Sequence, residues 1–86
     1  TGIVHGGIIA TVLDEAMGRL MYELKKGAVT GALKIRLNKP TLVGKAYTAI
    51  GEIVEEQERK ILAKSKLVDS KGNVTAEAEG VMVKVA

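Results

Sequence analysis

Residues 6–25, GGIIATVLDEAMGRLMYELK, contain the pattern that decides the fold of this 86-residue chain. Apolar side chains recur here every three or four residues, which predicts one amphipathic helix. The apolar positions are Ile9, Leu13, Ala16, Met17, Leu20 and Leu24, widened by Ile8, Val12 and Met21. An apolar arc this wide indicates a helix that other elements wrap around. Lys25, Lys26 and Gly27 come next, and we expect them to end the helix, with Gly27 as its C-terminal cap.

The rest of the chain alternates apolar and polar residues in four segments, which is the pattern of β-strands. The segments are residues 30–38, 45–54, 60–68 and 74–85. Short polar turns, residues 55–58 and 69–73, join the last three segments and predict an antiparallel meander. In the last segment Ala76, Ala78 and Gly80 share one face, where small side chains would let the helix approach closely.

Together these patterns predict an α+β fold in which residues 1–86 form a single domain. One long helix lies across a curved antiparallel sheet of at least four strands. A chain of this length buries only about 60–65% of the surface that its unfolded form exposes. Its core must also be built from aliphatic and methionine side chains, because the sequence has no Phe and no Trp. We therefore expect association with further copies of the chain to supply the missing burial.

The composition excludes several kinds of functional site. The chain has no Cys and one His, which leaves out thiol nucleophiles, thiolate zinc sites and multi-histidine metal clusters within one chain. Its two Tyr are too few to form a base-stacking platform for single-stranded nucleic acid. The net charge is +3, and the basic residues are spread along the chain. This distribution suits an anionic small ligand at least as well as a nucleic acid backbone, and we expect neither nucleic acid nor a metal ion as partner.

Nothing in the sequence points to a membrane. No apolar run approaches the ~18 residues that a membrane span needs, and no charged-then-apolar leader appears. Together with the absence of Cys, these features favour a cytoplasmic protein without a membrane partner.

Asp14 is the anomaly of the predicted helix. It lies inside the apolar stretch, with Ala10 and Gly18 one turn away on either side, and no basic residue stands three or four positions from it. An unpaired carboxylate on an apolar face costs several kcal/mol unless another group satisfies it. Two interpretations stay open: a hydrogen bond to a backbone group or a threonine hydroxyl across an interface, or a catalytic role. By contrast, Glu15 has an expected partner in Arg19, four residues on.

The start of the helix at Gly6–Gly7 is the second unusual feature, because most helices begin with a Ser, Thr, Asp or Asn cap. Two glycines would leave the first amide N–H groups bare, ready for an anion or a polarised carbonyl oxygen. A tight backbone turn is the alternative interpretation. Gly6 lies about 12 Å from Asp14 along the helix axis, so one substrate carbonyl cannot touch both. If they cooperate, they do so across a two-fold axis between two chains.

Around these residues the sequence resembles a known family. Residues 2–16, GIVHGGIIATVLDEA, are similar to the G-x-x-H-G-G…D signature of hotdog-fold acyl-CoA thioesterases. The resemblance is to the branch that includes the phenylacetate-pathway thioesterase and its 4-hydroxybenzoyl-CoA relatives. Further matching positions run through the whole chain: Val29–Thr30, Pro40, Gly44, Asp69–Gly72 and the small residues of the last strand. Members of this family usually carry an N-terminal helix, a first strand and an Asn or Gln before the signature, and we expect this chain to lack them.

The resemblance implies a central helix wrapped by an antiparallel sheet, homodimers that join their sheets, and dimers of dimers. It also implies hydrolysis of an acyl-CoA thioester without metal or organic cofactor. The backbone N–H of Gly6 would bind the thioester carbonyl, and Asp14 of the other subunit would act as nucleophile or general base. Thr30 matches the position of a hydroxyl that helps to place the attacking water.

The resemblance also implies residues that bind the substrate. His5 and Gly7 would shape the acyl and thioester pocket, and for His5 we expect a role in orienting the loop rather than proton transfer. Arg59 and Lys60 match the region that holds the phosphates of CoA. Two other functions stay open: a non-catalytic acyl-CoA-binding module, favoured by the missing upstream residues, and a dehydratase or hydratase.

Overall fold

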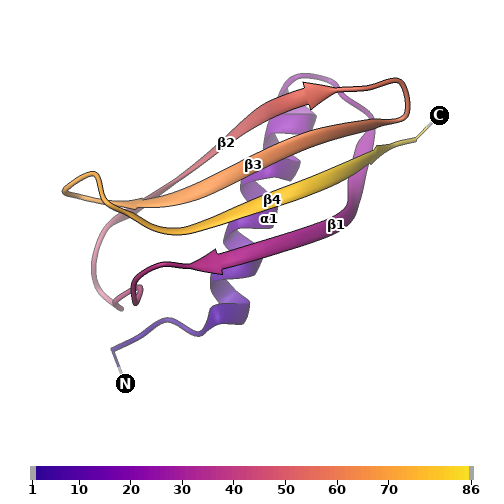
Figure 1. The fold of residues 1–86 in the computed structure, drawn as a ribbon. Helices are drawn as coiled ribbons and strands as arrows, with labels where there is room; N and C mark the ends of the chain where they lie inside the picture. The colour runs from indigo at the N-terminus through magenta and orange to yellow at the C-terminus, as the bar shows by residue number, and fades with distance from the viewer. Residues whose placement is uncertain (1, 86) are drawn as a thin grey trace.

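The computed structural model describes residues 2–85, which form one helix followed by four strands (Figure 1). The elements are α1 (Gly6–Glu23), β1 (Ala28–Leu37), β2 (Tyr47–Glu56), β3 (Lys60–Asp69) and β4 (Val74–Lys84). Each lies where the sequence pattern predicts it, with ends displaced by one or two residues. The predicted α+β architecture is therefore confirmed.

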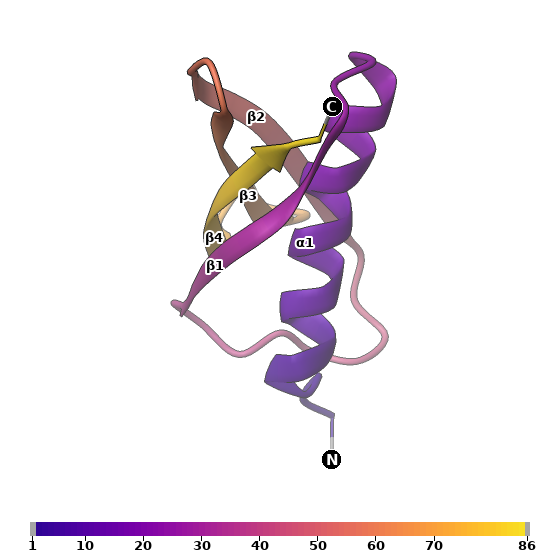
Figure 2. The same ribbon diagram turned by 90° about the vertical axis from the view of Figure 1, so that its right-hand side faces the viewer.

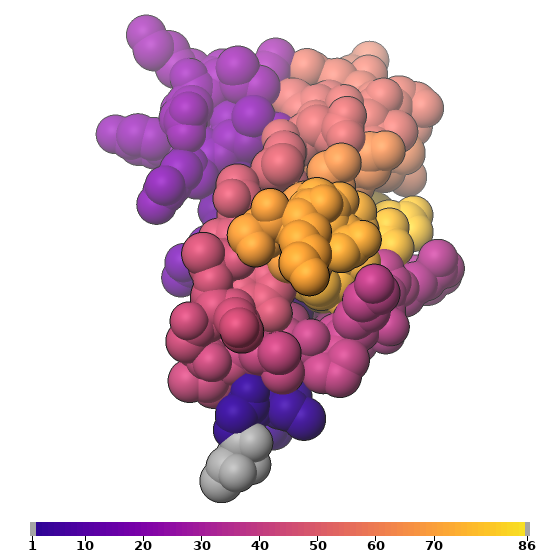
Figure 3. Space-filling view, turned by 90° about the vertical axis from the view of Figure 1, so that its left-hand side faces the viewer, coloured from indigo at the N-terminus to yellow at the C-terminus, as the bar shows by residue number. Residues whose placement is uncertain are grey.

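The four strands form one antiparallel sheet in the order β1-β4-β3-β2. The last three strands make the expected meander, while β1 pairs with β4 at the opposite edge from β2. Residues 38–46 must therefore cross from one edge of the sheet to the other, and they do so at the N-terminal end of α1 (Figure 1). Figure 3 shows this crossing, in pink, directly above the N-terminal segment, where the amide of Val4 donates to the carbonyl of Thr41 at 2.7 Å.

The helix packs on one face of the sheet and leaves the other face uncovered (Figure 2). Its buried stripe follows the four-residue helical spacing and meets buried side chains from β3 and β4. The buried residues of the core are Ile9, Leu13, Met17, Met21, Ile61, Ala63, Leu67, Ala76, Ala78 and Met82. Ile8 is 57% exposed and Val12 36% exposed, so the expectation that the whole apolar arc is wrapped is wrong for the single chain. A single curved sheet reaches only one side of a helix.

Small residues let the helix come close to the sheet, as the pattern on the last strand predicts. A Cβ atom at Gly80 would lie 2.9 Å from the sulfur of Met17, and one at Gly51 would lie 2.9 Å from the carbonyl oxygen of Ala16. Real Cβ atoms essentially never make contacts this short. A side chain at Gly51 would therefore push the helix backbone outward, and one at Gly80 would force the Met17 side chain to move.

The helix ends differently from the prediction, because Lys25 and not Gly27 adopts the left-handed conformation, with φ of 56°. The amide of Lys26 donates to the carbonyl of Met21 at 2.8 Å, and the amide of Lys25 to that of Tyr22 at 3.1 Å. This pair of bonds is a Schellman motif, which satisfies carbonyls at the end of the helix.

Within residues 2–85, the helix is too short or too polar to span a membrane.

Candidate active site

Asp14 and Thr30 are joined by a hydrogen bond in which the Thr30 hydroxyl donates to Oδ1 of Asp14 at 2.7 Å. Asp14 lies halfway along α1 and is half-buried, whereas Thr30 is exposed on the edge strand β1. None of the ion pairs formed among residues 2–85 involves Asp14, so no cation neutralises its carboxylate. The hydroxyl partner proposed for Asp14 therefore exists, but it comes from the same chain.

A bulge in β1 aims Thr30 at the helix. The register of β1 against β4 shifts between Thr30 and Ala32, which leaves Gly31 as the extra residue. A Cβ atom at Gly31 would lie 2.7 Å from a methyl group of Val83, so a larger residue here would have to displace that side chain. Bulges commonly re-aim a side chain in this way, and here the Thr30 hydroxyl also lies 3.8 Å from the buried sulfur of Met82.

His5 caps the helix N-terminus, so the expectation of two bare amides is wrong for Gly7. The amide of Gly7 donates to Nδ1 of His5 at 2.9 Å, and the His5 carbonyl accepts from the amide of Ile8 at 3.0 Å. Nδ1 of His5 thus takes the acceptor role that a side-chain oxygen of Ser, Thr, Asp or Asn has at most helix N-termini. The amide of Gly6, by contrast, has no partner among the described residues.

The structure does not bring the other predicted site residues to Asp14 within one chain. Gly6 lies two turns away on the same helix, about 12 Å along the axis. Arg59 lies in the turn between β2 and β3, at the end of the sheet away from the helix N-terminus (Figure 1). Lys60 pairs with Val83, and its side chain is exposed while that of its neighbour Ile61 is buried under the helix.

Sequence reasoning missed an ion-pair network close to this turn. Glu56 accepts from Lys26 at 2.8 Å and from Lys84 at 2.9 Å. These hydrogen bonds, first that of Lys26, hold the pKa of Glu56 below its ordinary value. The three residues are far apart in the sequence, so no local pattern signals them. Arg59 and Lys60 remain outside every ion pair among residues 2–85.

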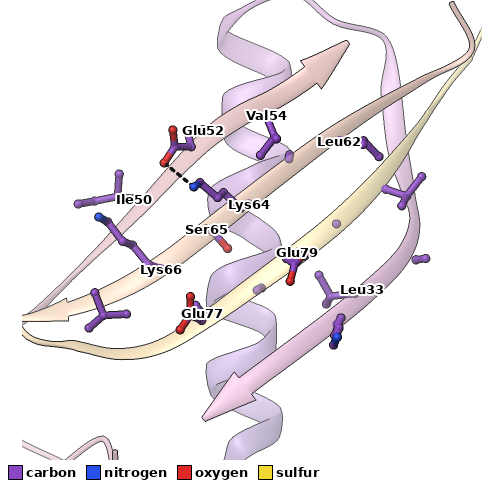
Figure 4. Close-up of a pocket in the computed structure, with 17 residues that line it drawn as sticks. Leu33, Ile50, Glu52, Val54, Leu62, Lys64, Ser65, Lys66, Glu77 and Glu79 are labelled. Carbon is purple, nitrogen blue, oxygen red and sulfur yellow. Dashed lines mark ion pairs between the residues drawn. The ribbon is translucent and has the colours of Figure 1, made fainter. Parts of the chain in front are cut away.

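Asp14 lines neither of two hollows on the described part of the molecule. The larger, about 810 Å³, lies on the face of the sheet opposite α1 (Figure 4). The smaller, about 420 Å³, lies between α1 and β2 and is lined in part by Glu15 and Arg19. The predicted pair between those two side chains is not formed, because no ion pair of residues 2–85 joins them. Asp14 and Thr30 border neither hollow; Asp14 is half-buried and Thr30 is exposed at the edge of the sheet.

The family model that describes the thioesterase superfamily matches residues 1–76. A comparison with curated proteins finds no match. Among solved structures, a Bacillus halodurans protein crystallised with CoA is 32% identical to the chain, with a TM-score of 0.85. The alignment covers 96% of this chain and 56% of the Bacillus protein.

Two more distant structures share the fold. A hypothetical thioesterase from Streptococcus pneumoniae, solved with coenzyme A, is 22% identical with a TM-score of 0.93, and the alignment covers 99% of this chain and 66% of that one. Variants of it with alanine in place of a threonine and of an aspartate have also been solved. The PaaI protein of the Escherichia coli phenylacetic acid degradation operon is 19% identical with a TM-score of 0.91, over 99% of this chain and 62% of PaaI. The chain spans less than two thirds of the length of the Bacillus and Escherichia proteins.

Proposed function

The chain belongs to the thioesterase superfamily and has its hotdog fold, and from that premise we propose that it hydrolyses an acyl- or aryl-CoA thioester to the free acid and CoA. The observation that carries this proposal is the 2.7 Å hydrogen bond between Thr30 and Asp14. It holds in one orientation a half-buried carboxylate that forms no ion pair among residues 2–85, which suits a general base or a nucleophile.

The proposed chemistry needs only groups that this chain supplies. Oδ1 of Asp14 accepts from Thr30, which leaves Oδ2 to take a proton from water. The water oxygen bonds to the thioester carbonyl carbon, the carbon–sulfur bond breaks, and the CoA sulfur leaves with the proton. In the alternative form of this mechanism, Asp14 itself attacks that carbon and water then hydrolyses the resulting anhydride.

A second copy of the chain would complete the site. The amide of Gly6, which has no partner among residues 2–85, would bind the carbonyl oxygen of a thioester attacked by Asp14 of the other subunit. Apolar side chains are exposed along the helix that carries Asp14 and along the edge strand that carries Thr30: Ile8 (57%), Val29 (56%), Leu33 (37%) and Leu37 (54%). A homodimer formed there would cover these side chains and pair the free edge of β1, which supports the shared site.

The substrate-binding part of the proposal rests on charge and on relatives. The Bacillus halodurans and Streptococcus pneumoniae proteins were solved with CoA. In this chain, Arg59 and Lys60 are adjacent cations outside the ion pairs of residues 2–85, and we assign them to the CoA phosphates. His5 and Gly7 form the capped loop next to Gly6 and would border the acyl group.

One further observation supports the roles of Asp14 and Thr30. The aspartate and threonine replaced by alanine in the Streptococcus pneumoniae variants stand 16 residues apart in that chain, with the aspartate first. Asp14 and Thr30 have the same order and the same separation of 16.

The test is release of free thiol from a panel of acyl- and aryl-CoA thioesters, measured for the wild type and for Asp14→Asn. Losing a carboxylate that acts in the transition state lowers kcat by at least about 10²-fold. Glu15→Gln is the matched control, because it removes the adjacent carboxylate from the same helix and should retain full activity. Full turnover by Asp14→Asn would refute the carboxylate mechanism. Binding of CoA by the wild type without any turnover would favour the non-catalytic binding module instead.

A further inference from the structure

Residues 38–46, here called the strap, are bonded to the segment that leads into α1. The strap crosses from β1 to β2 at the N-terminal end of the helix (Figure 1). Two backbone hydrogen bonds join it to residues 2–4: the amide of Val4 donates to the carbonyl of Thr41 at 2.7 Å, and the amide of Val43 donates to the carbonyl of Gly2 at 2.8 Å. The strap and residues 2–4 therefore form a short antiparallel ladder at the entrance to the helix.

The amide of Leu42, in the middle of the strap, finds its partner on the other side of the strap. Leu42 faces Ile3 between the two bonds of the ladder. In an antiparallel pair flanked in this way, the backbone N–H and C=O groups of both residues point away from the opposite strand. The Leu42 amide therefore cannot bond to residues 2–4. It donates instead to the hydroxyl oxygen of Tyr47 at 2.9 Å.

Tyr47 joins the strap to the sheet. It is the first residue of β2, where it pairs with Asp69 of β3, and its half-buried side chain packs against the hydrophobic core. Among residues 2–85, no other group accepts from the Leu42 amide. Removing the Tyr47 hydroxyl would therefore release the middle of the strap, while the aromatic ring could keep its packing.

The strap lies next to Gly6 at two points. Val4, which the ladder holds, stands two residues before Gly6, and His5 between them caps the helix. Leu37 directly precedes the strap, and a Cβ atom at Gly6 would lie 3.4 Å from its side chain. A shift of the strap would thus be passed on to the residues that set the direction of the Gly6 amide.

We propose that Tyr47 is a positioning residue that acts through the strap and holds the Gly6 amide in the direction needed to bind the thioester carbonyl. This inference rests on the proposed function, in which that amide is the oxyanion donor. Such a donor must lie about 2.7–3.1 Å from the position of the oxyanion, and small displacements of a reacting group lower the rate strongly. Tyr47 itself touches no substrate in this scheme.

The test is Tyr47→Phe, which removes the hydroxyl and keeps the ring. Tyr22→Phe is the matched control, because Tyr22 is the other tyrosine of the chain and is 84% exposed. In thiol release from the acyl- and aryl-CoA panel, we expect Tyr47→Phe to lower kcat about tenfold with KM unchanged. Tyr22→Phe should change neither constant.

A double-mutant cycle identifies the group through which Tyr47 acts. In a Gly6→Pro background, which lacks the amide hydrogen, Tyr47→Phe should lower kcat no further. In a Thr30→Val background the loss of about tenfold should remain, because Thr30 bonds to Asp14 and not to the strap. The same loss in the Gly6→Pro background as in the wild type would overturn the proposal.

A second measurement does not require turnover. The backbone amide resonance of Gly6 and the hydrogen exchange of the Leu42 amide are compared by nuclear magnetic resonance in the wild type and in both tyrosine variants. We expect faster exchange at Leu42 and a shifted Gly6 resonance in Tyr47→Phe alone. An unmoved Gly6 resonance would overturn the proposal. A wild type that releases no thiol would refute the proposed function, while the resonance of Gly6 would still decide whether Tyr47 positions its amide.

Discussion

Ser65 shows how a single hydroxyl holds the turn of helix that carries Asp14. Its side chain is 3% exposed and donates to the carbonyl of Leu13 at 2.9 Å, across the contact between β3 and α1. Leu13 immediately precedes Asp14. This bond therefore fixes the position of the helix relative to the sheet where the Asp14 carboxylate accepts the hydrogen bond from Thr30. A buried hydroxyl bonded to a carbonyl typically contributes about 1 kcal/mol to the free energy of unfolding.

Replacing Ser65 with Ala should therefore affect both stability and catalysis. We expect a loss of about 1 kcal/mol in the free energy of unfolding. We also expect a fall of about tenfold in kcat with KM unchanged, because small displacements of a reacting group are costly. Thr75→Val is the matched control: Thr75 is 2% exposed and donates to the carbonyl of Leu67 at 3.3 Å, within the sheet. Equal losses of kcat in the two variants, measured by thiol release, would show that Ser65 acts only through stability.

The sequence alone marks Asp14 as unusual, and the structure shows why a carboxylate is tolerated at that position. Asp14 stands out in the sequence because no cation lies one turn away from it. Its partner Thr30 is contributed by a bulged strand, and bulges leave no reliable local signal. The sequence does not signal His5 as the helix cap, because histidine is not among the usual capping residues. Its Nδ1 nevertheless accepts a hydrogen bond as an Asn oxygen would.

Among the elements, the turn between β3 and β4 is organised by Asp69. One of its carboxylate oxygens accepts from the amide of Asn73 at 2.8 Å and from the amide of Lys71 at 2.9 Å. These bonds to the ionised form, above all that from the Asn73 backbone, hold the pKa of Asp69 below its ordinary value. The residue types Asp, Ser, Gly and Asn predict such a turn from sequence alone, because each favours turn geometry.

The lowered pKa of Asp69 makes the stability of this hairpin depend on pH. Because the pKa is lower in the folded than in the unfolded chain, the contribution is complete above the ordinary aspartate value of about 3.9. It is lost as the pH falls through the lowered pKa of the folded state. In urea unfolding, Asp69→Asn should be less stable than the wild type at pH 7, and the difference should shrink towards pH 2. A difference that is the same at both pH values would contradict this role for Asp69.

The strands themselves were predictable because alternation of apolar and polar residues is a local signal. Ile61, Ala63, Ser65 and Leu67 are all buried against the helix, as their period of two requires. The position of β1 beside β4 was not predictable, since strand order depends on contacts between segments far apart in the sequence. The same limit applies to the network of Glu56 with Lys26 and Lys84.

For the whole molecule, the expectation that further copies of the chain supply missing burial stays a prediction, and the single chain leaves apolar side chains exposed. Ile8 and Leu37 are each more than half exposed beside the helix N-terminus. Val54 is 58% exposed on the face of the sheet opposite α1. Apolar side chains are therefore exposed on two separate surfaces, one beside the helix N-terminus and one on the face of the sheet opposite α1. The proposed shared site uses the first of these, and the amide of Gly6 is the group that tests it.

Gly6→Pro would remove that amide with little other change. Gly6 is the first residue of α1, where proline is well tolerated, and His5 at φ −62° and ψ 140° already has the conformation that a following proline requires. A Cβ atom at Gly6 would meet Leu37 at 3.4 Å, an ordinary contact distance. Loss of one oxyanion donor should lower kcat by about 10²–10³-fold, measured by thiol release, with the helix content by circular dichroism unchanged. Undiminished turnover would exclude the Gly6 amide from the reaction.

The most direct measurement of the shared site is thiol release by mixed dimers of Asp14→Asn and Gly6→Pro. Each variant alone should be nearly inactive, since every site in its homodimer lacks either the carboxylate or the amide. In a mixed dimer one of the two sites combines Asp14 from one chain with the Gly6 amide from the other. After unfolding and refolding the two variants together, we expect about a quarter of the wild-type activity per chain, as random pairing requires. Activity no higher than that of the separate variants would show that the two groups do not act across the two-fold axis.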